Sequence, residues 1–170
     1  MVGRGGRVKA ELQNEEAIAR AAAKREAAIE EAYDRLRPLS PGKHPMKAEL
    51  NQQYGPFRDP AYDIDITGTY DLDHVIPLRE VVEMPGFLDL TPSNQLAVAN
   101  LPENLVRMSP ATNRSRGDLR FSEWIDKGHS QLGPVLSATR RRTLLNLERD
   151  AFRSVRGAID YRLRLQSVGN

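Results

Sequence analysis

The sequence predicts an α+β fold that is mostly helical, with short strands in its middle and a long helix near each end. Residues 8–37 contain neither Gly nor Pro, and residues 137–165 repeat apolar side chains at helical spacing. Between them, residues 63–66 alternate polar and apolar side chains, and residues 70–76 form a second extended segment. The 170 residues fit one domain with a helical appendage.

The first helix is expected to be amphipathic and to end at Pro38 and Pro41. Glu15 and Glu26 lie on its apolar stripe, which argues against a long coiled coil. We therefore assign residues 1–37 to a helix or connecting region and residues 38–170 to the main domain. The stripe consists of Val8, Leu12, Ala19, Ala22, Ile29, Tyr33 and Leu36.

The elements that follow are predicted from local signals. Residues 38–62 have few apolar side chains and are expected to form a loop. Ser or Thr before Pro is typical of a helix start, because the hydroxyl caps a free backbone N–H group and Pro fits the first turn. Gly is a typical helix stop. These signals predict helices near 78–82, 92–98, 110–116 and 121–127 and a strand at 104–108.

The last helix, in a helical part spanning residues 137–166, is expected to direct one face toward the core. That face consists of Leu144, Leu147, Phe152, Val155, Ile159 and Leu163.

Composition excludes several classes of function. The chain has no cysteine, so disulfides, thiolate metal sites and cysteine nucleophiles are ruled out. No apolar run approaches the roughly 20 residues that cross a bilayer, and the first thirty residues show no signal peptide. Residues 104–170 carry thirteen basic and six acidic side chains, which fits a polyanionic partner. An arginine-rich, solvated helix surface explains the same charge.

Three segments together indicate hydrolytic chemistry. Asp73-His74 ends the second extended segment, Asn104 opens the next strand, and Asn113 lies nine residues later in a helix. A neutral histidine suits the removal of a proton from water near neutral pH, because its unperturbed pKa is about 6.5. Hard divalent cations prefer oxygen ligands such as those of Asp73 and Asn113.

This order of strand, strand and helix resembles the HNH endonucleases, whose core is a ββα-metal unit. The matching residues are Asp73, His74, Asn104 and Asn113, with the asparagine-to-asparagine interval typical of that family. The resemblance places the ββα core at about residues 63–129, between flanking N- and C-terminal helices, within an HNH nuclease domain of residues 38–170.

The resemblance also implies a role for each residue. His74 would be the general base, Asn104 would orient it through a hydrogen bond to nearby backbone, and Asp73 and Asn113 would hold the metal. Neighbours on a strand point to opposite faces, so the family pattern implies that the strand end bends toward the helix. Asn in place of His at the third position favours Mg²⁺ or Mn²⁺, with Zn²⁺ as the alternative.

Several cations are candidates for binding phosphate. Arg114 and Arg116 lie beside Asn113 and could grip phosphate oxygens in bidentate fashion. Ion pairing with Asp118 or Glu123 on the helix surface is the competing interpretation.

Other basic side chains lie further along the chain. Arg140, Arg141 and Arg142 gather near a helix start, where the helix dipole disfavours cations, and this indicates an external anion. His129 could approach the phosphate or the metal, or be an ordinary surface residue. Trp124 is expected in the core.

Residues 70–129 more narrowly resemble the HNH nuclease toxin domains of bacterial polymorphic toxins, including effectors of contact-dependent and type VI secretion. The resemblance rests on residues 73–78, 84–87, 94–100 and 103–104. It implies a DNase delivered as part of a larger polypeptide, acting in the cytoplasm of a target cell and blocked by a cognate immunity protein. The expected substrate is DNA.

Three alternatives remain open. An RNase toxin or a phage or mobile-element HNH enzyme would use the same residues on other targets. A non-catalytic ββα module would bind nucleic acid or protein through its helical flanks.

Overall fold

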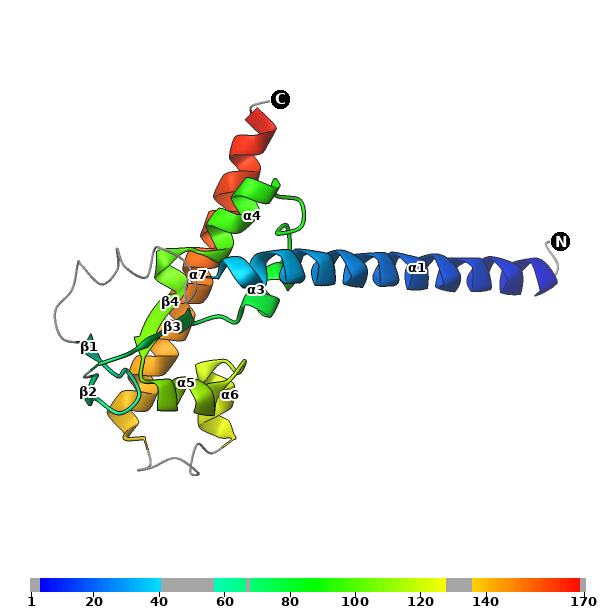
Figure 1. Cartoon of the computed structure of the whole chain (residues 1–170). Coiled ribbons are helices and arrows are strands. Elements are labelled where there is room, and N and C mark those ends of the chain that lie inside the picture. The colour runs from blue at the N-terminus through cyan, green and yellow to red at the C-terminus, as the bar shows by residue number, and fades with distance from the viewer. Residues whose placement is uncertain (1–3, 41–56, 67, 128–135, 169–170) are drawn as a thin grey trace.

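The computed structural model describes residues 4–40, 57–66, 68–127 and 136–168. These residues form a mostly helical α+β fold with two short antiparallel sheets, which confirms the predicted fold class. Figure 1 shows the long helix α1 projecting from a body that the second long helix, α7, crosses. The elements are α1 (Arg4–Leu36), η1 (Arg37–Leu39), β1 (Phe57–Arg58), β2 (Asp65–Ile66), β3 (Asp71–His74), α3 (Leu78–Glu83), α4 (Pro92–Ala99), η3 (Pro102–Asn104), β4 (Leu105–Met108), α5 (Pro110–Arg116), α6 (Phe121–Asp126) and α7 (Ala138–Val168).

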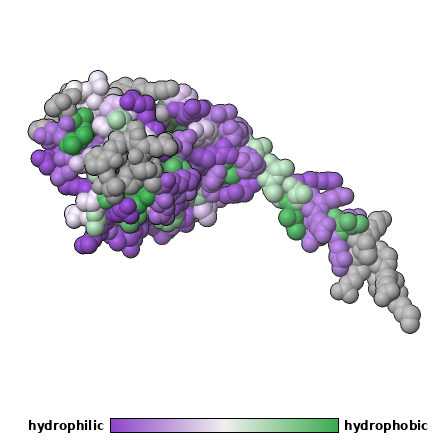
Figure 2. Space-filling model, turned by 90° about the horizontal axis from the view of Figure 1, so that it is seen from below, coloured by the Kyte–Doolittle hydropathy of each residue, from purple (hydrophilic) through white to green (hydrophobic). Residues whose placement is uncertain are grey.

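Among the side chains of α1 that the structure describes, those of its last turns belong to the core. Ile29, Ala32 and Leu36 are buried, and they pack in the cluster that includes α3. Upstream, Leu12, Ala19 and Ala22 of the expected apolar stripe are exposed, so this part of the prediction is wrong. Figure 2 shows hydrophilic and hydrophobic surface mixed on the projecting part of the helix. Helix propensity extends α1 well beyond the segment that packing requires.

The centre of the fold is β3 paired with β4 and followed by α5. The strands are antiparallel, with Asp73 opposite Val106 and His74 opposite Leu105. Ser109 caps α5, its hydroxyl accepting a hydrogen bond from the Thr112 backbone N–H group at 3.2 Å. Gly117 ends the helix with φ 56°, a left-handed conformation that glycine adopts without strain. The cap and the stop are those expected from the sequence.

The helix α7 packs along most of its length against η3, α4 and α6. Its buried face is formed by Leu144, Ala151, Val155 and Ile159. Phe152 was predicted to be in the core, but 37% of it is exposed, because Ala151 takes the inward position one residue earlier. The Phe152 ring instead lies under the Arg120 guanidinium, 5.6 Å from it.

One segment differs from the prediction, and one predicted core residue is confirmed. Residues 38–62 were expected to be a loop, yet Phe57–Arg58 forms β1, paired with β2. Trp124 is buried as predicted, and its indole N–H donates to Ser115 at 3.1 Å. Among the described residues, no helix has both the length and the apolar character that crossing a membrane demands.

Candidate active site

A cleft of about 560 Å³ opens at the end of β3. Asp73 and His74 both line it, so the structure brings together the two adjacent residues singled out from the sequence. The end of α1 and the start of η1 form another part of its wall, through Tyr33 and Arg37. The remaining lining residues are Ser40, Pro77, Leu78, Arg79, Glu80, Arg116, Gly117, Asp118, Leu119 and Glu123.

The strand β3 presents two different faces. Asp71 and Asp73 are half-buried, whereas Leu72 and His74 are buried, which is the alternation of a regular strand. Both aspartates bond to α5: Asn113 Nδ2 donates to Asp71 at 3.1 Å, and Arg116 donates to Asp73 at 2.6 Å. Because Asn113 and Arg116 are three residues apart, they share one face of the helix. These two bonds join α5 to β3.

His74 is held in one tautomer. Its Nε2 lies 2.8 Å from the backbone carbonyl of Ala99, which can only accept, so Nε2 carries the hydrogen. In the neutral ring Nδ1 is then the unprotonated nitrogen. Burial lowers the pKa of His74, against the opposing effects of the Ala99 carbonyl and the Asp73 charge. The imidazole is therefore neutral at neutral pH, with Nδ1 able to accept a proton.

Asn104 fixes the chain immediately after His74. It is fully buried, and its side chain accepts from the Ile76 N–H group at 2.7 Å and donates to the Ile76 carbonyl at 3.1 Å. The backbone carbonyl of Asn104 accepts from the Val75 N–H group at 2.8 Å. This is the kind of backbone bond that the family resemblance implies. Asn104 thus fixes the backbone of Val75 and Ile76 and lies outside the lining of the cleft.

Asp73 keeps free capacity to bind a cation. One carboxylate oxygen accepts from the His74 N–H group at 2.8 Å, and the other accepts from Arg116 at 2.6 Å. A carboxylate has about four acceptor positions, so each oxygen retains a lone pair. The side chain is 31% exposed and lines the cleft, which leaves these lone pairs accessible.

Asn113 has its amide oriented by a carboxylate. Asp71 can only accept a hydrogen bond, so Nδ2 faces Asp71 and Oδ1 is the oxygen left for another partner. The carboxylate oxygens of Asp73 and the amide oxygen of Asn113 are each the kind of ligand that a hard cation accepts. Asn113 itself is half-buried and does not belong to the cleft lining.

The described residues contain no cluster of three or more His, Cys, Asp or Glu side chains suited to a metal. A site built on Asp73 and Asn113 would consequently need water and substrate oxygens to complete its coordination, as magnesium sites commonly do.

Arg116 differs from its predicted role. Its side chain is 1% exposed, and it donates to the carbonyls of His74 at 2.7 Å and Leu119 at 3.2 Å as well as to Asp73. A further bond reaches the carbonyl of Val75 at 3.3 Å. An interior guanidinium with these partners cannot also grip an external phosphate in this conformation. The residue instead fixes the end of β3 and orients Asp73.

The other predicted cations are scattered. Arg114 is exposed on α5, and Arg141 and Arg142 are exposed near the start of α7. Arg140 forms an ion pair with Asp63, so part of its charge is already neutralised. None of these four lines the cleft. His129 lies outside the described residues.

One important residue escaped the sequence argument. Asp59 is fully buried and accepts bonds from Ser109 N–H at 2.9 Å and from the Thr112 hydroxyl at 2.7 Å. It also accepts from the backbone of Ala61 at 2.9 Å. Asp59 therefore ties the loop before β2 to the first turn of α5. The Asp59-Pro60 pair is a turn signal, but it does not reveal a partner fifty residues away.

Comparison with known proteins returned no match, whether against protein-family models, curated proteins or solved structures.

Proposed function

We propose that this chain is a metal-dependent endonuclease of the HNH type that hydrolyses phosphodiester bonds in DNA. The observation that carries the proposal is the pairing of Asp73 and His74 at one cleft, with His74 buried, neutral and fixed on the Ala99 carbonyl. The strand–strand–helix order of β3, β4 and α5 supports it, because a ββα-metal core has the same order.

His74 is the general base of the proposed reaction. Nδ1 accepts a proton from a water molecule, the water oxygen bonds to phosphorus, and the bond from phosphorus to the leaving sugar oxygen breaks. Solvent supplies the proton that the leaving oxygen takes up. Asn104 holds the chain after His74, and Ala99 prevents the ring from presenting its other nitrogen.

Asp73 and Asn113 are the proposed ligands of a divalent cation, Mg²⁺ or Mn²⁺. Such an ion would neutralise part of the negative charge that builds on the phosphate and the leaving oxygen. Arg116, which also lines the cleft, donates to the Asp73 carboxylate and would hold it in place.

A plasmid assay tests the proposal. Purified protein with Mg²⁺ or Mn²⁺ is expected to degrade supercoiled plasmid DNA, and His74→Ala is expected to lower the rate by at least about 100-fold, the usual contribution of a general base. Circular dichroism and unfolding midpoints of both proteins show whether the variant is folded. A folded His74→Ala protein with wild-type activity contradicts the assignment.

The same assay separates the alternatives. Cleavage of RNA but not DNA would favour an RNase, and cutting at a few sites would favour a phage or mobile-element enzyme. DNA binding without cleavage in any divalent metal would favour a non-catalytic module.

The biological setting is proposed from the resemblance of residues 70–129 alone. In that setting the chain is the toxic part of a larger secreted effector, acts in the cytoplasm of a target bacterium and is blocked by an immunity protein. Expression of the chain in a bacterial host tests this: growth should stop, and His74→Ala should restore it.

A further inference from the structure

We propose that Arg37, at the junction of α1 and η1, binds a backbone phosphate of the nucleic acid in the cleft. The inference rests on the proposed nuclease function and adds a substrate-binding residue from the N-terminal helix. It means that the end of this helix is part of the substrate site.

The position of Arg37 is fixed by the packing of α1. Ile29, Ala32 and Leu36 anchor the last turns of the helix in the core. Arg35 bonds to the buried side chain of Gln95, and the carbonyl of Leu39, the last residue of η1, accepts from Asn100 at 3.1 Å. The backbone on both sides of Arg37 is therefore tied to the body of the protein.

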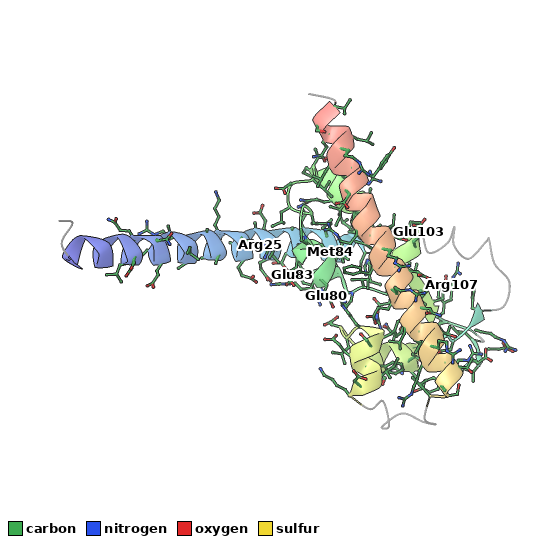
Figure 3. All side chains as sticks on the ribbon, turned by 180° about the vertical axis from the view of Figure 1, so that it is seen from behind. Arg25, Glu80, Glu83, Met84, Glu103 and Arg107 are labelled. Atoms are coloured by element: carbon green, nitrogen blue, oxygen red, sulfur yellow. The ribbon has the colours of Figure 1, made fainter. Side chains whose placement is uncertain are left out.

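A second set of contacts holds α1 against α3. Arg79 of α3 pairs with Glu26 at 2.5 Å and also with Glu30, both on α1. Arg25 donates to the Glu83 carbonyl at 2.8 Å, and Figure 3 shows it beside Glu83 and Met84 at the end of α3. These contacts keep the end of α1 in place as one wall of the cleft.

The charges in the cleft explain why Arg37 matters. Its lining contains four carboxylates, from Asp73, Glu80, Asp118 and Glu123, and three guanidinium groups. Two of those guanidinium groups are engaged: Arg116 bonds to Asp73 and Arg79 pairs with carboxylates on α1 and α3. A polyanion entering this cleft needs a cation that is not already neutralised.

Arg37 is that cation among the described lining residues. It is exposed, and its contact is with the Tyr33 ring, whose centroid lies 5.9 Å from the guanidinium carbon. An aromatic contact orients a guanidinium without using its N–H donors. Those donors can then meet a phosphate in bidentate fashion.

Binding to labelled duplex DNA in EDTA tests the proposal without any cleavage. Arg37→Gln is compared with Arg20→Gln, which removes the same charge from α1, about 25 Å away along the helix axis. Arg20 is 83% exposed and pairs only with Glu16 among the described residues, so it is a matched control. Both variants should keep the circular dichroism and unfolding midpoint of the parent.

The logarithm of DNA affinity falls linearly with the logarithm of salt concentration, and we expect Arg37→Gln to make this fall shallower by about 0.9. Binding at 0.1 M salt should weaken about eightfold, the effect of one lost phosphate contact. Arg20→Gln should change neither. Equal affinity and slope for the two variants would overturn the assignment of Arg37. Failure of the parent to cut DNA with metal would instead overturn the nuclease function, and the binding comparison would remain readable.

Discussion

The two walls of the cleft are held in place by different forces. On the β3–α5 side, Arg116 is buried and bonds to Asp73 and three backbone carbonyls, and Asp59 ties the start of α5 to a loop. On the α1–α3 side, apolar packing around Ile29 carries the contact, and the ion pairs of Arg79 lie at the surface. The β3–α5 wall thus depends on a few buried polar groups, and the α1–α3 wall depends on apolar area.

This difference has consequences for substitution. Removing one partner of a buried polar network leaves the others unsatisfied, which costs far more than the net contribution of one bond. Removing an exposed ion pair returns both partners to water at little cost. The same change of charge should therefore have large effects on one wall and small effects on the other.

The largest effect is expected from Arg116→Met. The change strands the buried carbonyls that Arg116 now satisfies, at about 1–3 kcal/mol for each unsatisfied group, so we expect it to lower the free energy of unfolding by about 3–5 kcal/mol. Urea unfolding measures it. Arg114→Met, two residues earlier on the same helix and exposed, should stay within about 0.5 kcal/mol of wild type. Equal stability of the two variants would show that Arg116 is not an interior anchor.

Ile29→Ala should have a similar or slightly smaller effect on the other wall. Ile29 is fully buried, and such truncations cost about 2–5 kcal/mol because of lost transfer energy and the cavity left behind. Ile18→Ala is the control on the same helix, because 61% of Ile18 is exposed. If Ile18→Ala destabilised the protein as strongly, the projecting part of α1 would have to be packed in solution.

Asp59 provides a smaller effect with a distinct pH dependence. Burial alone would raise the pKa of Asp59, but bonds from Ser109, Thr112 and Ala61 outweigh it and lower the pKa below its usual value. A carboxyl group with a depressed folded-state pKa stabilises the protein above its unfolded pKa of about 3.9. That stabilisation is lost as the pH falls through the lower, folded-state value.

Asp59→Asn should therefore cost about 1–3 kcal/mol near neutral pH, because one amide cannot accept all of these bonds. The difference in unfolding free energy between this variant and wild type should be constant above about pH 5 and should shrink below about pH 3.9. Urea unfolding across this range measures the gap. A gap that persists unchanged at the lowest pH would mean that charge at Asp59 is not the cause.

Local signals were enough to predict the frame of the site. The caps at Thr91 and Ser109 and the stop at Gly117 act within a few residues, so α4 and α5 lie where the sequence places them. The strands β3 and β4 lie within the extended segments predicted at residues 70–76 and 104–108, although Asn104, expected to open the second strand, belongs to η3. The sequence alone accordingly places Asp73 and His74 at the end of a strand, as in β3.

The misplaced residues all depend on long-range contacts. Arg116 was expected to bind phosphate or to form an ion pair on the helix surface, since a charged helix residue is usually solvated. Its burial depends on β3, forty-three residues away along the chain. Phe152 and Ala151 differ by one position on a helix, and spacing alone does not fix that rotation. The contribution of α1 to the cleft wall likewise depends on how α1 packs against α3.

The smallest effect is expected at Arg79, in spite of its three carboxylate partners. These partners are about half exposed, so solvent screens each pair, and Arg79→Gln should leave the unfolding midpoint unchanged within error. The proposed nuclease activity should also persist, because the apolar contacts of Ile29 and Leu36 keep Arg37 at the cleft. A matched loss of stability and DNA affinity in Arg79→Gln would mean that ion pairs, and not apolar packing, hold this wall.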